Sequence, residues 1–192
     1  MKELRVANLN IEQREAGSSS LVLVGTPIVF DTPTVINDPA GSYTEIIERR
    51  ALDGADLSDV RLLVNHDSNR IPLARTPKTM TLTVTPNGLQ MRAELADTSE
   101  AKSVYEAIKR GDLSGMSFCF TVGDDSFDIG TKTRIIHKIN KLYECSVVNF
   151  PAYPQTSVEA RSKLDYYAQR AALIKQTKLL ANNILRLRTY YI

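Results

Sequence analysis

The 192-residue sequence lacks tryptophan and contains only two cysteines and two histidines. Cys119 and Cys145 form no C-x-x-C pair, so a zinc site is poorly supported, and we expect no metal or other cofactor. No apolar run reaches 18 residues, which argues against a membrane span. The first ten residues, MKELRVANLN, lack the apolar core of a secretory signal. We therefore expect a cytosolic protein with reduced cysteines.

Charge is unevenly distributed along the chain. From residue 159 onward, seven basic residues stand against two acidic ones, which gives +5 and leaves −3 for residues 1–158 of the total +2. This asymmetry divides the chain into a body, 1–158, and a basic tail, 159–192. The tail has no nucleic-acid-binding motif, so we favour a partner-binding amphipathic helix over a nucleic-acid contact.

The body has mostly strand patterns. Residues 20–30, SLVLVGTPIVF, indicate a strand with a bulge or bend at Gly25 and Pro27. Residues 79–95 alternate polar and apolar residues on both sides of Pro86-Asn87-Gly88, which predicts a hairpin. Residues 44–52 fit a short strand or a helix, and residues 134–150 fit one long strand or two.

Helical patterns occur twice. Residues 97–110 carry an apolar stripe, with Asp97 as the expected N-cap and Gly111 as the stop. A second helical pattern runs from Val158 to about residue 188, with Leu164, Tyr167, Ala171 and Ile174 on one face. The prediction is an α+β, mostly β fold: a closed or partly open β-barrel with flanking helices and a C-terminal amphipathic helical tail.

Two serines in GDLSGMSFCF, residues 111–120, raise the question of a nucleophile. In a strand from Gly115, Ser117 points away from the face that carries Phe118 and Phe120. A reactive serine needs a base, an oxyanion site and a rigid mount. On these residues alone, Ser114 as a turn cap and Ser117 as an ordinary strand residue are the better interpretation.

Candidate partners for such a serine occur on both sides of it. His66 follows a buried-strand pattern in VNHDSNR, where it could titrate near neutrality or bond to Asn65 or Asp67. Glu144 alternates onto a face with Ser146 and Val148, so it needs a partner. That partner is a catalytic histidine, or Lys141 or Arg134.

The order and spacing of these segments resemble the prohead serine proteases of tailed phages. The resemblance covers roughly residues 20–158, and its most specific parts are the N-H-D, G-x-S-F-x-F and E-x-S-x-x-x-x-P-A-Y motifs. Ala74 and Cys119 stand where the family pattern has glycine. The segments that carry it are VGTPIVFD, TEIIERRAL, LLVNHDSNRIPLART, LTVTPNGLQMRAEL, RGDLSGMSFCF and LYECSVVNFPAYPQTSV.

The resemblance implies a β-barrel akin to the herpesvirus maturational protease and a serine endopeptidase. Its site would comprise His66 as the base, Ser117 rather than Ser114 as the nucleophile, and Glu144 as the third member. His137, in the same segment as Glu144, is the alternative third member, and we expect backbone amides near Ser117 together with Arg75 to stabilise the oxyanion. The implied substrates are phage scaffold or capsid protein and the protease itself, cut in the host cytoplasm inside the assembling prohead. We expect no membrane or nucleic-acid partner. The tail could recruit the protease, form a homodimer or be trimmed by self-cleavage.

Overall fold

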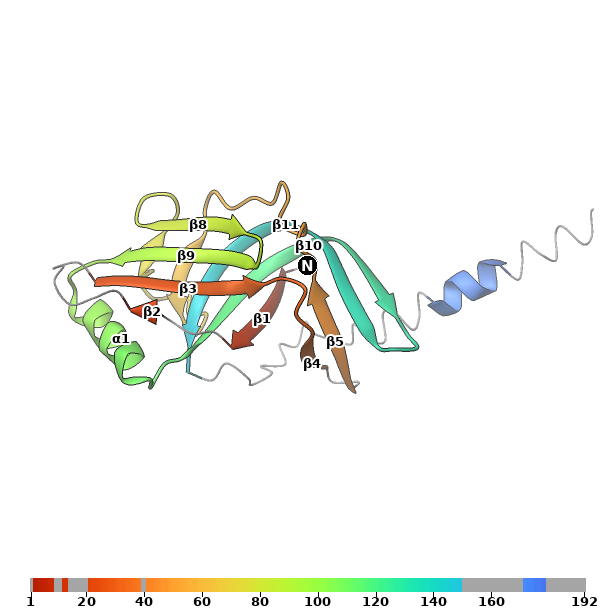
Figure 1. The fold of residues 1–192 in the computed structure, drawn as a ribbon, viewed down its shortest axis with the longest axis horizontal. Coiled ribbons are helices and arrows are strands. Elements are labelled where there is room, and N and C mark those ends of the chain that lie inside the picture. Colours follow the sequence, from red (N-terminus) through yellow and green to blue (C-terminus); the bar gives the residue numbers. More distant parts are fainter. Residues whose placement is uncertain (1, 9–11, 14–20, 39–40, 150–170, 179–192) are drawn as a thin grey trace, which may run out of the picture.

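The computed structural model describes residues 2–8, 12–13, 21–38, 41–149 and 171–178. Its strands form two sheets, with helix α1 (Ser99–Arg110) at one end of the molecule (Figure 1). In the seven-stranded sheet, the main order is β1 (Lys2–Asn8), β10 (Gly115–Asp128), β11 (Thr133–Val148), β5 (Gly41–Ile47) and β4 (Thr34–Asp38), and β6 (Arg61–Val64) and β7 (Ala74–Arg75) branch from β11. The four-stranded sheet has the order β2 (Glu12–Gln13), β3 (Leu21–Val29), β9 (Gly88–Leu95) and β8 (Met80–Thr85).

Neither sheet closes into a ring through the strand pairings described, so the closed form of the predicted barrel is not found among these residues. The reason lies in β11, which is 16 residues long. One edge of β11 pairs with β10, and the other pairs in parallel with β5 near its start and with β6 near its end. The larger sheet therefore branches instead of curling onto itself. The coarser prediction, an α+β fold that is mostly β, is confirmed.

Strands β10 and β11 form the long hairpin that runs through the molecule (Figure 1). Their register is continuous from Gly115 to Cys119 and then shifts at several points between Cys119 and Asp125. Such bulges bend the strands, which explains how the distal part of the hairpin leaves the core. The proximal part, where the register is regular, is the part that carries the candidate site.

The two sheets enclose one hydrophobic core. Phe118 and Phe120 of β10 point into it as the alternation predicted, and their exposed fractions are 2% and 0%. Strand β3 approaches β10 so closely that a Cβ built on Gly25 would lie 2.5 Å from the sulfur of Met116. This contact packs the smaller sheet directly against the residue that precedes Ser117.

Several local predictions are confirmed. Strand β3 pairs with β9 through a register shift between Gly25 and Ile28, and β8 and β9 form the expected hairpin. Residues 44–47 belong to strand β5, and β11 is one long strand. Helix α1 ends at Gly111, which adopts a left-handed backbone with φ of 83°. Its N-cap, however, is Thr98 rather than Asp97, because the Thr98 hydroxyl oxygen accepts a hydrogen bond from the Ala101 amide.

Little of the predicted tail is described. Residues 171–178 are helical, within the predicted range, and Leu173 and Ile174 expose 63% and 48% of their surface. The rest of the tail and the proposed boundary at 158/159 lie outside the described residues. No helix among the described residues is long and apolar enough to cross a membrane.

Candidate active site

The candidate site lies on the paired strands β10 and β11. Ser117 stands directly opposite Ser146, and Cys119 stands opposite Glu144. Opposed residues of antiparallel strands share a face, with Cβ atoms about 4.5–5.5 Å apart. Ser117, Ser146 and Glu144 therefore occupy one small area of the same sheet face.

A turn after β6 brings His66 to this area. Strand β6 pairs in parallel with β11, so that Val64 lies beside Val147, and the next amide, of Asn65, donates to the Val147 carbonyl at 2.9 Å. Asn65 and His66 both have positive φ, 51° and 60°. This conformation is uncommon for residues other than glycine and tends to occur at functional sites, where the surroundings hold it in place.

Side-chain amides support this turn. Asn65 Nδ2 donates to Asn149 Oδ1 at 3.2 Å, and the Asn149 amide donates to Asn65 Oδ1 at 3.1 Å. Two hydrogen bonds therefore tie the residue before His66 to the residue after the end of β11. The asparagine of the N-H-D motif thus has a structural task in fixing where the histidine points.

His66, Glu144 and Ser146 form a connected set of hydrogen bonds. His66 Nδ1 lies 2.7 Å from Glu144 Oε1, and Ser146 Oγ donates to Glu144 Oε2 at 2.5 Å. The His66 amide in turn donates to Ser146 Oγ at 3.2 Å. In the tautomer in which Nδ1 donates to Glu144 Oε1, Nε2 carries the lone pair that a general base needs.

The exposure of the three side chains fits this arrangement. Glu144 and Ser146 are buried, whereas the His66 side chain is 26% exposed. A buried carboxylate needs hydrogen-bond partners, and here the histidine and the serine hydroxyl supply them. The alternative partners considered for Glu144 are bonded elsewhere: Lys141 Nζ donates to Asp56, and Arg134 binds other carboxylates.

Ser117 is fully buried, and its Oγ donates to the carbonyl oxygen of Arg5 in β1 at 2.6 Å. Ser114 is exposed, in the turn before β10. Of the two serines, Ser117 is the one that the sheet register sets beside Ser146. In this conformation its hydroxyl proton points to β1.

His137 belongs to a second cluster, on the distal part of the β10–β11 hairpin. Its Nδ1 lies 2.9 Å from Glu48 Oε2, and its Nε2 lies 2.8 Å from Ser126 Oγ. These contacts repeat the serine–histidine–carboxylate order, but Ser126 is exposed and the hairpin register is irregular there. Of the two candidates for a third member, Glu144 lies within hydrogen-bonding distance of His66, whereas His137 contacts Glu48.

Arg75, expected beside the oxyanion, lies on β7. Its Nε donates to Asp59 Oδ1 at 2.7 Å, and its strand is separated from β11 by β6. We therefore leave it out of the site. Among the described residues, no group of three or more His, Cys, Asp or Glu side chains could hold a metal ion.

Of the two cysteines, Cys145 alternates onto the strand face opposite to Glu144 and Ser146. Cys145 is fully buried on the core side of β11, and burial raises the pKa of its thiol well above the ordinary value. A thiol in such surroundings behaves as a small hydrophobic residue. Cys145 is therefore a poor candidate for a nucleophile.

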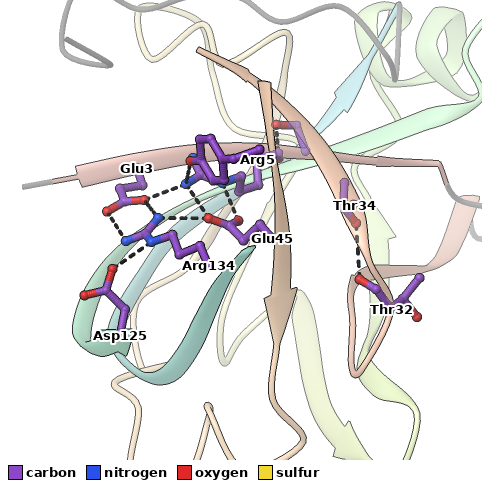
Figure 2. A network of polar contacts seen from close by, with 9 residues as sticks. Glu3, Arg5, Thr32, Thr34, Glu45, Asp125 and Arg134 are labelled. Carbon is purple, nitrogen blue, oxygen red and sulfur yellow. Dashed lines mark hydrogen bonds and ion pairs between the residues drawn. The ribbon is translucent and has the colours of Figure 1, made fainter. Parts of the chain in front are cut away.

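Sequence reasoning missed a buried ionic cluster at the β1 edge of β10. It lies on the sheet face opposite to the Ser117 side chain, because Arg5 and Glu3 stand opposite Phe118 and Phe120. It joins β1 to three other strands and consists of Glu3, Arg5, Glu45, Asp125 and Arg134 (Figure 2). Arg5 donates to both Glu45 carboxylate oxygens, at 2.5 and 2.7 Å. Burial lowers the pKa of Arg5, but the charges of Glu45 and Glu3 more than offset this, and the pKa lies above its ordinary value.

Sequence signals for the missed residues were weak. The alternation predicts that Ser146 shares a strand face with Glu144, but it does not indicate that the Ser146 hydroxyl donates to the Glu144 carboxylate. Glu3 and Arg5 also alternate in KELRVAN, which is a strand pattern near the start of the chain. Their partners Glu45 and Arg134 are far away in sequence, and pattern reasoning does not reveal such pairs.

Comparisons with known proteins agree on one group. The sequence model of a family described as Caudovirus prohead serine protease matches residues 7–170. A curated relative, the prohead protease of Enterobacteria phage HK97, is 32% identical over 107 residues, which cover 55% of this chain and 46% of that protein. The match therefore spans about half the length of this relative. No solved structure matches the chain at a significant level.

Proposed function

Because the chain belongs to the caudovirus prohead serine protease family, we propose that it is a serine endopeptidase of prohead maturation. The observation that carries the proposal is the 2.7 Å contact between His66 Nδ1 and Glu144 Oε1, beside a strand pair that sets Ser117 opposite Ser146. A histidine held by a carboxylate next to a serine is the arrangement that activates a hydroxyl nucleophile.

The reaction is acyl transfer. Ser117 Oγ attacks the carbonyl carbon of the scissile peptide bond, and His66 Nε2 takes the hydroxyl proton. His66 then gives this proton to the leaving amine as the C–N bond breaks. Water, deprotonated by His66, attacks the acyl-enzyme ester and restores Ser117. Backbone N–H groups near Ser117 stabilise the oxyanion.

Glu144 and Ser146 act through the histidine. Glu144 holds His66 in the tautomer with the proton on Nδ1 and stabilises the imidazolium that forms during the reaction. Ser146 donates to the second carboxylate oxygen and so fixes the orientation of Glu144. The hydrogen bonds to both carboxylate oxygens hold Glu144 in place, which is what this role requires.

The substrates that we propose are phage scaffold or capsid protein and the protease itself, cut inside the assembling prohead in the host cytoplasm. The support is the family and the HK97 relative, which is named a prohead protease. We further propose that the basic tail, 159–192, recruits the enzyme to this compartment or mediates a homodimer. A non-catalytic assembly protein with the same fold is the competing hypothesis.

Substitution of the proposed catalytic residues tests the mechanism. Co-expressed with its phage's capsid and scaffold proteins, the wild type should process them, whereas Ser117→Ala and His66→Ala should lower the cleavage rate by about 10³-fold or more. Mass spectrometry of the products measures this. Ser114→Ala and Ser126→Ala are matched controls and should cleave like the wild type.

Each outcome decides between named alternatives. Unchanged processing by Ser117→Ala and His66→Ala rejects the mechanism. Loss of processing in Ser114→Ala alone moves the nucleophile to that residue, and loss in Ser126→Ala alone moves the chemistry to the Glu48–His137–Ser126 cluster. No processing by the wild type favours the non-catalytic assembly protein.

A further inference from the structure

Ser117 cannot attack a substrate in the conformation described. Its side chain has no exposed surface, and its hydroxyl proton is donated to the Arg5 carbonyl of β1 at 2.6 Å. A nucleophilic serine must instead give that proton to the histidine and must meet the carbonyl carbon of the substrate. The first requires the Ser117 side chain to turn away from the Arg5 carbonyl, and the second requires β1 to move so that a substrate can reach the hydroxyl.

The backbone around Ser117 is also occupied. Residues Gly115 to Cys119 pair with β1 on one side and with β11 on the other, in continuous register. The N–H groups on both edges of this segment therefore serve in sheet pairing. An oxyanion site built from backbone amides near Ser117 becomes available only when one neighbouring strand leaves. Strand β1 is at the edge of its sheet, whereas β11 is central.

Besides its backbone pairing with β10, strand β1 is held by buried ion pairs. Glu3 accepts from Arg134 at 2.5 and 3.0 Å, and Arg5 donates to Glu3 at 2.7 Å as well as to Glu45 (Figure 2). Arg134 is fully buried. Removing one partner of a buried ion pair is strongly destabilising, so a segment that displaces β1 must supply a charge in place of the one removed.

The residues of the ionic cluster that lie outside β1 would attract a positively charged side chain. Without Glu3 and Arg5, the cluster consists of Arg134, Glu45 and Asp125, which carry one positive and two negative charges. Phe120 adds an aromatic face, 5.7 Å from the Arg5 guanidinium. A basic side chain from an extended segment would occupy this place as Arg5 does.

We propose that β1 is an autoinhibitory strand that occupies the edge of β10 on which an extended polypeptide substrate pairs, with a basic residue in the place of Arg5. This proposal rests on the proposed function, because it assigns the substrate edge of the same site. Substrate binding then follows strand addition: main-chain hydrogen bonds hold the segment, and a side-chain pocket gives specificity. The protease is active only after β1 has left the edge of β10.

A reversible crosslink in the full chain tests the proposal. Leu4 lies directly opposite Cys119, so Leu4→Cys places two thiols at a distance that a cross-strand disulfide can bridge. A fluorophosphonate probe reports the accessibility of Ser117 through mass mapping of the labelled peptide.

We expect Ser117 in oxidised Leu4→Cys to be labelled at least about tenfold more slowly than in the same protein after reduction. The control is Leu4→Cys with Cys119→Ser, which should not respond to oxidation. Equal rates for the oxidised and reduced protein overturn the proposal.

Breaking the ion pairs that hold β1 should speed the labelling of Ser117. Arg5→Ala removes the ion pairs with Glu45 and Glu3, and we expect Ser117 to label about tenfold faster than in the wild type. Arg92→Ala, which removes an exposed arginine of β9, is the matched control and should leave the rate unchanged. The synthetic peptide KELRVAN should slow labelling of Arg5→Ala, and KELAVAN should not. Equal effects of the two peptides reject the basic pocket.

A further variant separates this proposal from the proposed function. In Ser117→Cys, alkylation of position 117 by iodoacetamide reports accessibility without any need for a serine nucleophile. Faster alkylation when Arg5→Ala is added supports the autoinhibitory strand even if the fluorophosphonate fails to label Ser117, a failure that would count against the proposed catalysis alone. Unchanged alkylation overturns the autoinhibitory strand.

Discussion

His66 is held at the candidate site by its backbone as much as by its side chain. Its φ of 60° follows the φ of 51° at Asn65, and the His66 amide donates to Ser146 Oγ. Two consecutive left-handed residues that are not glycine persist only where neighbouring contacts hold them. The strand pairing of β6 with β11 and the Asn65–Asn149 hydrogen bonds supply those contacts.

Ser146 should therefore act as a positioning residue. We expect Ser146→Ala to lower kcat by about 10- to 100-fold, because Glu144 loses one donor and the His66 amide loses its acceptor. KM should change little, since Ser146 is buried and contacts no substrate. Steady-state kinetics on a peptide substrate measures both. A rise in KM with kcat unchanged would contradict this role, and Ser126→Ala is the control.

Tyr43 should make stability sensitive to alkaline pH. Burial raises the pKa of Tyr43 to about 12, and the Arg5 guanidinium opposes only part of this shift. The pKa of Tyr43 in the folded state exceeds its unfolded value of about 10. The contribution of Tyr43 to the free energy of unfolding is therefore fully present below pH 10 and is lost as the pH rises to about 12. In this window, the unfolding free energy of the wild type should fall more steeply than that of Tyr43→Phe, by up to about 1.4 kcal/mol per pH unit. Urea unfolding at several pH values measures the slopes, and parallel slopes would refute the assignment.

At the scale of elements, the hairpin of β8 and β9 depends on one glycine. Gly88 has φ of 156°, and a Cβ built on it would lie 2.1 Å from the carbonyl oxygen of Ile28. Because this neighbour is backbone, it cannot move aside as a side chain could. We expect Gly88→Ala to lower the free energy of unfolding by about 2–3 kcal/mol. Gly54→Ala has open space at the Cβ position and serves as the control for positive φ alone. Equal losses in both variants would refute the proposed clash.

Elements with local signals were predictable from the sequence. The turn at 86–88 sets the hairpin, and Gly111 ends α1, because each depends on residues adjacent in the chain. The N-cap was misassigned by one position, since Asp97 and Thr98 are both good caps and the chain path decides between them.

The neighbours of each strand were not predictable in the same way. No pattern in residues 2–8 indicates pairing with β10, and Glu3 is 131 positions away from Arg134. The contact of His66 with Glu144 also spans 78 positions, and it was expected from the family motifs rather than from periodicity. Buried ionic clusters form from strands that meet only in the folded sheet, so their members look like surface charges in the sequence.

At the scale of the whole molecule, the tail should be separable from the body. The core described is formed by residues of the two sheets, of α1 and of the loops between them, all between Val22 and Val148. We expect deletion of residues 160–192 to leave a folded protein that cleaves a peptide but is not packaged into proheads. Thermal unfolding, peptide cleavage and prohead co-purification test this. Aggregation of the shortened chain would show that the tail completes the core.

The branched sheet also accounts for the difference from the predicted barrel. The alternation of apolar and polar residues predicted strands with one buried face, which two packed sheets satisfy as well as a closed barrel does. Closure depends on which strands meet at the edges, and here β11 binds β5 and β6 at its two ends. Pattern alone does not encode that choice.

A strand that covers its own active site competes with substrate at a high effective concentration. Tethered to the same chain, β1 reaches its edge as though it were present at about millimolar concentration. A substrate in dilute solution loses that competition, whereas a substrate crowded into a closed shell meets the enzyme at a comparable local concentration. The pairing of β1 with β10 would thus make the protease a sensor of confinement, idle outside the shell and active once its substrates are gathered around it.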